Sequence, residues 1–218
     1  MFLSDAEATA IDAQIGRLES CTGVQVVTAV IGKADNYIEL PWKAFALGAA
    51  LAGSCVTLAD VRWPQWVTSH TALVHATTIL GVAAASALLA VFVPPFARLF
   101  LRDARGHAEV RQHARALFLT RELFKTGSRT AVLVLVSRFE RRIDILPDIG
   151  LHARVTEAEW DSVIARMAPR LREARPFHAL QDGLNAIESL LVSKGFQAGA
   201  GSGTINELPD HPIEEPGV

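Results

Sequence analysis

The stretch "TALVHATTILGVAAASALLAVFVPPF" (Thr71 to Phe96) decides the fold, because it is too apolar for a soluble surface. Between Trp63 and Ala97 the chain contains no Lys, Arg, Asp or Glu. A helix over most of this stretch is long enough to cross the hydrocarbon core of a bilayer, which takes about 20 residues. Pro94 and Pro95 end it, because proline cannot continue helical hydrogen bonding. The sequence therefore predicts a membrane-spanning helix.

A second apolar stretch, Leu40 to Ala59, precedes the first and contains one charged residue, Lys43. As a helix it would span roughly 30 Å, the thickness of the hydrocarbon core. The Lys43 side chain near its end can extend to the headgroups. We therefore expect a transmembrane helical hairpin over residues 40–97. The residues expected at its membrane interface are Trp42, Lys43, Trp63, Trp66, Arg98 and Arg102.

The orientation of the hairpin follows from its basic flanks. Lys33 and Lys43 precede it and a series of arginines follows it, whereas its loop holds only Arg62, offset by Asp60. The positive-inside rule then places both termini in the cytoplasm. The N-terminal segment "MFLSDAEATA" has acids where a signal peptide has basic residues, so no cleaved export signal is expected.

The flanking segments have the pattern of a soluble α/β domain. "SDAE" (Ser4 to Glu7) is a capping box that opens a helix. "VQVVTAVI" (Val24 to Ile31) and "TAVLVLV" (Thr130 to Val136) are typical of buried strands, and "RIDIL" (Arg142 to Leu146) alternates like a third strand. Further helices are expected after the hairpin, after Thr156, and from about Phe177 to Lys194.

The hairpin interrupts the crossover between the first two strands. Two antiparallel spans return to the side on which they began, so these strands can still pair in parallel through a right-handed crossover. We therefore expect one α/β domain built from residues 1–39 and 98–195, with the hairpin inserted in its first β-α-β crossover. Residues 196–218 are rich in Gly and Pro and hold four acids and no Lys or Arg, so an extended or disordered acidic tail is expected.

Asp144 and Asp148 are the best candidates for chemistry. They lie at the end of a predicted strand, where α/β folds usually place their sites, and could act as a metal-binding or acid–base pair. In the alternative, Asp148 is a turn residue that binds local backbone and Asp144 pairs with an arginine. His152, four residues after Asp148, is a third catalytic candidate; a solvated surface histidine is its alternative. The sequence has no phosphate-binding loop and no zinc-site spacing.

Basic residues gather after the hairpin. From Arg98 to Arg142 there are 11 Lys or Arg against 4 Asp or Glu. Contact with lipid headgroups is one interpretation, and an ordinary solvated helix face is the other. Nucleic acid is not expected as a partner, because no aromatic platform or recognition motif accompanies the charge.

Three segments together resemble the TPM-domain family, in its membrane-bound bacterial branch. They are "TAVLVLVSRFERRIDILPDIGLHARV" (Thr130 to Val155), "EAEW" (Glu157 to Trp160) and the tail "NELPDHPI" (Asn206 to Ile213). The resemblance implies an α/β/α sandwich and, for this branch, the bacterial inner membrane. Relatives include proteins linked to phosphatase activity and to calcium binding, and bacterial genes of this type tend to neighbour those of LemA-family membrane proteins.

One turn departs from the family pattern. Soluble relatives carry an Asn/Asp-rich turn before the second strand, which supplies metal oxygens. Here that turn is "KTGSR" (Lys125 to Arg129), without a carboxylate. Calcium prefers several oxygen ligands, including carboxylates, so we expect no calcium at this turn and no cofactor.

The resemblance and the hairpin together give two functional hypotheses. The first is a membrane-tethered, non-enzymatic interaction or assembly module, whose partners are the bilayer and another membrane or envelope protein, such as a LemA-family neighbour. The alternative is a metal-dependent, phosphatase-like hydrolase that uses Asp144 and Asp148. The sequence leaves the oligomeric state open.

Overall fold

The computed structural model describes residues 2–64, 70–197, 208 and 211–217. The chain forms two compact units, an α/β unit from residues 1–35 and 104–218, and a helical unit from residues 36–103. The expected interface residue Trp66 lies outside the described residues.

Local sequence signals set the ends of the helices in the α/β unit. Ser4 and Glu7 form the predicted capping box at the start of α1, and the main chain of Gly23, at a φ of 73°, ends that helix in a left-handed conformation that glycine adopts without strain. Thr156 donates its backbone N–H to Glu159 at the start of α7. The elements are α1 (Asp5–Thr22), β1 (Gln25–Ile31), α5 (Asp103–Thr120), the 3₁₀ helix η2 (Leu123–Lys125), β2 (Ala131–Ser137), β3 (Arg142–Pro147), α6 (Ile149–His152), α7 (Glu157–Arg172), α8 (Pro176–Ser193) and β4 (Ile213–Glu215).

The four strands form one sheet in the order β3-β2-β1-β4. β1 and β2 pair in parallel, with Val27 opposite Leu133, as the predicted β-α-β unit requires. β3 runs antiparallel to β2. β4 comes from the acidic tail and adds a parallel strand to β1, with Val30 opposite Glu214. The tail thus covers the edge of β1, a pairing that the sequence does not predict.

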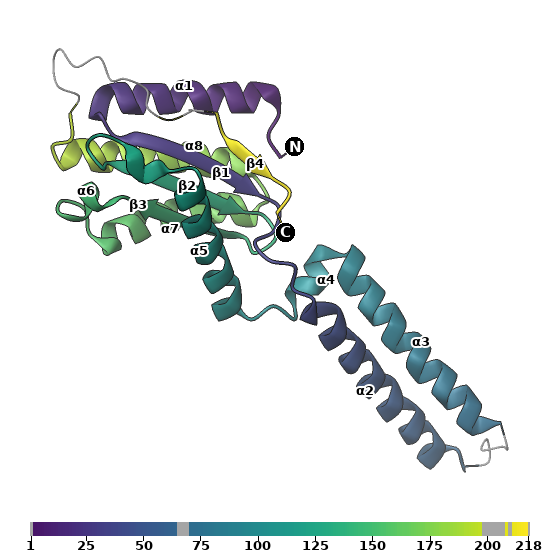
Figure 1. The fold of residues 1–218 in the computed structure, drawn as a ribbon. Helices are drawn as coiled ribbons and strands as arrows, with labels where there is room; N and C mark the ends of the chain where they lie inside the picture. The colour runs from purple at the N-terminus through teal and green to yellow at the C-terminus, as the bar shows by residue number, and fades with distance from the viewer. Residues whose placement is uncertain (1, 65–69, 198–207, 209–210, 218) are drawn as a thin grey trace. The chain divides into compact units, whose positions relative to one another are not determined.

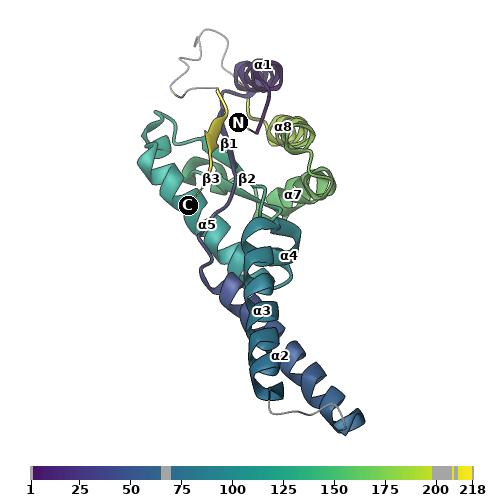
Figure 2. The ribbon, with the colours of Figure 1, turned by 90° about the vertical axis from the view of Figure 1, so that its right-hand side faces the viewer.

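Helices cover both faces of this sheet and give the predicted α/β/α sandwich (Figures 1 and 2). One core joins α1, α7 and α8 to one set of strand residues, such as Val26 and Val132. The other core joins α5 to the alternate set, such as Val27 and Leu133. Because successive strand residues point to opposite faces, β1 and β2 are buried along their whole lengths. This explains their continuous apolar sequences.

The second unit contains an antiparallel pair of long helices. They are α2 (Glu39–Arg62) and α3 (Thr71–Phe92), followed by the short α4 (Pro94–Arg98). Both long helices are long and apolar enough to cross a membrane. Small residues line their contact: a Cβ on Gly48 would lie 2.5 Å from the Ser86 Oγ and 3.1 Å from the Cα of Ala83. The helices can therefore approach closely, as packing in lipid requires.

The rest of the hairpin surface is apolar and uncovered. Of the twenty large hydrophobic residues that are exposed among the described residues, seventeen lie between Asn36 and Asp103. In the most apolar 18-residue stretch of each helix, only 17% of α2 and 11% of α3 is buried within the protein. A soluble protein rarely exposes so much contiguous apolar surface. This distribution indicates association with a membrane.

Candidate carboxylate site and its surroundings

Asp148 is held by the turn that precedes β2. Its carboxylate accepts two hydrogen bonds from Arg129, from Nε to Oδ2 at 2.9 Å and from Nη2 to Oδ1 at 3.1 Å. Oδ1 also accepts the backbone N–H of Ile149 at 2.8 Å and caps α6. The Asp148 side chain is 5% exposed and that of Arg129 50% exposed. The Asp148 carboxylate is thus a buried anion with a bidentate cationic partner.

Gly150 completes this arrangement. Its N–H donates to the Arg129 carbonyl at 2.9 Å. A Cβ at Gly150 would lie 2.5 Å from that oxygen and 2.9 Å from the Ser128 carbonyl oxygen, so only glycine permits this approach. Arg129 itself has a φ of 55°, in the left-handed region. Asp148 and Gly150 therefore fasten the turn before β2 to the end of β3.

The direction of β3 places Asp148 at an unexpected edge of the sheet. Pro147 pairs with Val132 near the start of β2, because β3 is antiparallel to β2. Asp148 therefore lies beside the amino ends of the parallel strands. Ligands of open α/β sheets usually bind at the carboxyl ends. The sequence locates the strand end correctly, but only the topology shows which edge that end occupies.

Asp144 lies in the middle of β3, opposite Leu135. Its neighbours Ile143 and Ile145 belong to the core beneath α1, α7 and α8, so Asp144 faces α5. Oδ1 lies 3.9 Å from the Arg111 Nε, and Oδ2 is buried without a hydrogen-bond partner. Burial raises the pKa of Asp144, against the opposing effect of Arg111, His107 and Arg115.

The two carboxylates contact different arginines on different elements. Asp148 binds Arg129 from the turn, and Asp144 is near Arg111 on α5. His152 is exposed on α6. Within the described parts of the chain, no three His, Cys, Asp or Glu side chains are grouped so that they could hold a metal ion. Sequence reasoning identified both acids but not these arginines, since nothing local relates Arg129 to Asp148.

The carboxyl ends of β1 and β2 are occupied by the protein's own chain. The backbone N–H of Arg138 donates to the Ile31 carbonyl at 3.0 Å, and Glu140 Oε1 accepts the N–H of Ala34 at 2.9 Å. Asp35 and Arg105, which flank the helical unit, form an ion pair at 3.1 Å. The turn after β2 therefore holds the segment that leads to the hairpin, and the two chain connections are held together.

A shallow groove lies between α7 and α8, away from both acids. It has a volume of about 250 Å³. Its acid, Glu159, accepts hydrogen bonds from Lys194 at 2.6 Å and from the Thr156 backbone at 2.9 Å, which lower its pKa to about 2. The lining residues are Glu159, Ser162, Val163, Arg166, Ala186, Ser189 and Leu190. Because Glu159 is already paired, the groove offers no obvious catalytic acid.

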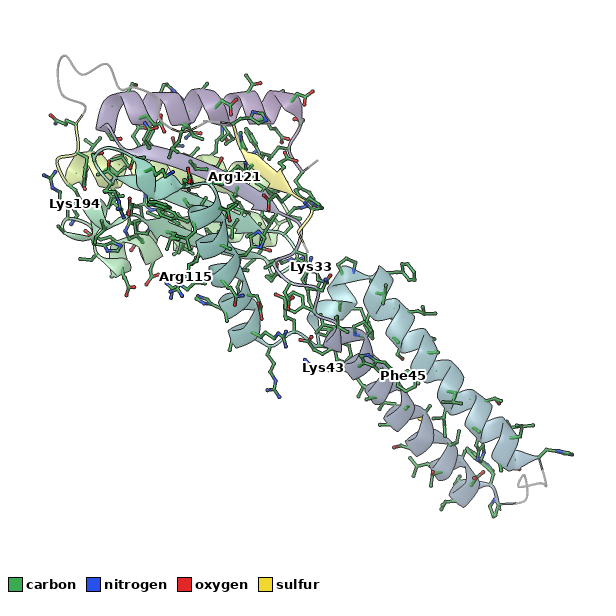
Figure 3. All side chains as sticks on the ribbon, viewed as in Figure 1. Lys33, Lys43, Phe45, Arg115, Arg121 and Lys194 are labelled. Atoms are coloured by element: carbon green, nitrogen blue, oxygen red, sulfur yellow. The ribbon has the colours of Figure 1, made fainter. Side chains whose placement is uncertain are left out.

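The expected interface residues gather partly at one end of the hairpin. Trp42, which is 68% exposed, packs edge-on against Phe45, with 6.0 Å between the centres of the two rings. Figure 3 labels Phe45 on α2. Lys43 donates to the Phe100 carbonyl at 3.4 Å, so the start of α2 lies beside the segment that follows α4. Arg98 and Arg102 belong to that segment, whereas Trp63 follows the far end of α2. Cations therefore collect at the end where the chain enters and leaves the hairpin.

Comparison with known proteins defines the class. Residues 90–190 match the family model of the TPM domain. Over nearly its whole length the chain also resembles the NMR structure of the BA42 protein from the psychrophilic bacterium Bizionia argentinensis. The TM-score is 0.59 with 14% sequence identity, over 98% of this chain and 96% of that one, which shows a shared fold. No curated protein sequence matches the chain. Residues 90–190 of the chain are thus similar to the TPM domain, the family that the strand and turn motifs resemble.

Proposed function

We propose that this protein is a membrane-tethered TPM domain that acts as a non-enzymatic interaction or assembly module for membrane or envelope proteins. The observation that carries the proposal is the exposed apolar surface of the hairpin. The two chain connections between the hairpin and the α/β unit are joined by the Asp35–Arg105 ion pair. A bilayer would cover that surface, and the tether would keep the α/β unit beside the membrane. We propose that this membrane is the inner membrane of a bacterium.

The state of the two acids supports a non-enzymatic role. A metal ion at Asp148 would have to replace the bidentate Arg129 partner. That guanidinium is always protonated and already supplies the positive charge that a bound cation would bring. For the same reason we propose that no calcium ion binds at the 125–129 turn. Asp144 lies near Arg111, whereas Asp148 binds Arg129. The two acids therefore do not form a pair of carboxylates that could share one metal ion.

We expect the purified protein to show no hydrolysis of a generic phosphate monoester, with or without divalent metals. The measurement compares the detergent-solubilised parent with Asp144→Asn and Asp148→Asn. An exposed-site variant, Asp161→Asn on α7, controls for the loss of one charge. Metal-dependent turnover that both site substitutions abolish, and that the control retains, would replace this proposal with the hydrolase alternative.

The cations near the hairpin entry also predict its orientation. A reporter inserted in the connection between α2 and α3 is expected outside the cytoplasm, and a reporter fused to the C-terminus inside it, because basic flanks stay on the cytoplasmic side. The measurement uses two fusions at each position, one to a reporter that is active only outside the cytoplasm and one to a reporter that is active only inside it. Cytoplasmic activity of the α2–α3 reporter would contradict the orientation.

A further inference from the structure

The two flanks of α5 differ in how their basic residues are paired. On one flank, Arg105 forms ion pairs with Asp35 at 3.1 Å and Glu109 at 3.6 Å. Glu215 on β4 lies close to two basic side chains. Its Oε2 is 3.6 Å from the Nε2 of His113, and its Oε1 is 3.5 Å from the Nη2 of Arg121. The basic groups on this side are therefore matched by acids of the α/β unit itself.

The other flank carries His107, Arg111 and Arg115. They follow one another at intervals of four residues and so share one side of the helix, and all three are exposed. Their shared counter-charge is Asp144, whose side chain is 9% exposed and lies 3.9 Å from Arg111. Within the described residues, His107 and Arg115 have no ion pair of their own. We call these three residues the α5 basic strip (Arg115 is labelled in Figure 3).

The length of the strip favours an extended anionic surface over a small anion as its ligand. Its ends, His107 and Arg115, lie eight positions apart on the helix, which at 1.5 Å per residue is roughly 12 Å. Basic side chains spread along a line of that length on a convex helix do not converge on one phosphate group. They match a surface that presents many phosphates side by side, such as a bilayer containing anionic lipid.

We propose that the α5 basic strip docks on the headgroups of anionic phospholipids. This inference rests on the proposed function, because the hairpin is what brings a bilayer near. α5 begins at Asp103, directly after the exposed Arg102 and close in sequence to the end of α3 at Phe92. Docking would give the α/β unit a second, charge-dependent contact with the membrane, in addition to its covalent tether.

The test places a fluorescent donor beside the strip. Ala108 is exposed on α5 next to these residues, so the full chain is labelled through Ala108→Cys in a Cys21→Ser, Cys55→Ser background. It is reconstituted into phosphatidylcholine vesicles with a headgroup-labelled acceptor, with or without phosphatidylglycerol. Energy transfer is expected to be higher with the anionic lipid and to fall in high salt, which shortens the screening length.

Substitution separates the strip from overall charge. Arg111→Gln with Arg115→Gln is expected to lower the docked-to-undocked ratio roughly 30-fold, since each basic group near an anionic surface contributes about one kcal/mol. Arg166→Gln with Arg172→Gln removes the same charge from exposed sites on α7 and is expected to leave transfer unchanged.

Two further readouts complete the test. Co-flotation of the chain with vesicles after alkaline washing reports insertion separately: a chain that does not co-float would overturn both the tethering and the docking. A chain that inserts, but whose energy transfer is the same with and without phosphatidylglycerol, would overturn the docking alone. Loss of transfer on adding inorganic phosphate at constant ionic strength would also overturn it, because that result requires a compact phosphate site.

Discussion

Replacing residues 36–103 with a short Gly/Ser linker is expected to move the protein from the membrane to the soluble fraction while the α/β unit stays folded. Both hydrophobic cores are built from residues outside this segment. Asp35 and Arg105 are 3.1 Å apart at their charged groups, so a short linker can join the two connections. Closing a short loop costs little conformational entropy compared with the stability of a complete core.

Fractionation of cells and thermal unfolding of the soluble product measure this effect. As a matched control, the same linker replaces only residues 63–70 between α2 and α3, and this protein is expected to stay in the membrane fraction. The membrane assignment of the hairpin would be wrong if the variant without residues 36–103 remained membrane-bound. Aggregation without cooperative unfolding would show that the α/β unit depends on the hairpin to fold.

Asp148→Ala is expected to lower the free energy of unfolding by about 2 kcal/mol, because it removes a helix cap and the buried member of an ion pair. The loss is smaller than for a fully buried pair, since Arg129 is 50% exposed and water can solvate its charge. Urea denaturation of the soluble variant described above provides the measurement.

A similar loss is expected for Gly150→Ala, whose Cβ would meet two backbone carbonyls.

An exposed acid supplies the comparison for that loss. Asp161→Ala on α7 is expected to change stability by less than about 0.5 kcal/mol. If Asp148→Ala were as mild as this control, the Asp148–Arg129 pair would not stabilise the turn. Asp148 would then have to be explained by a role in binding or chemistry.

The antiparallel course of the hairpin explains how the α/β unit can carry two long apolar helices without losing its fold. Two antiparallel helices return the chain to its starting point, so β1 and β2 keep the parallel register of Val27 with Leu133. The carboxyl edge of these strands, where many α/β proteins bind ligands, is here the place where the chain leaves for the hairpin.

Local features of this protein could be predicted from the sequence. The Ser4–Glu7 capping box, the continuous apolar strands and the two uncharged spans depend on side chains within a few residues of one another. Helix ends, strands and the hairpin follow from them. The alternation around Asp144 likewise indicated that it faces away from Ile143 and Ile145. Those two residues lie in the core beneath α1, α7 and α8, whereas Asp144 lies near Arg111 on α5.

The partners of charged groups were decided by the tertiary structure. Arg129 meets Asp148 because β3 runs antiparallel to β2, and Glu215 meets Arg121 because the tail pairs with β1. In the hairpin, α2 continues to Arg62, so Asp60 lies on the helix with its Oδ2 3.4 Å from the Nδ1 of His75. The α5 basic strip is distinguishable from the paired flank of the same helix only once these neighbours are in place. Periodicity shows which face a side chain occupies, but the strength of a charge contact depends on separation and burial, and both arise only when distant segments are packed together.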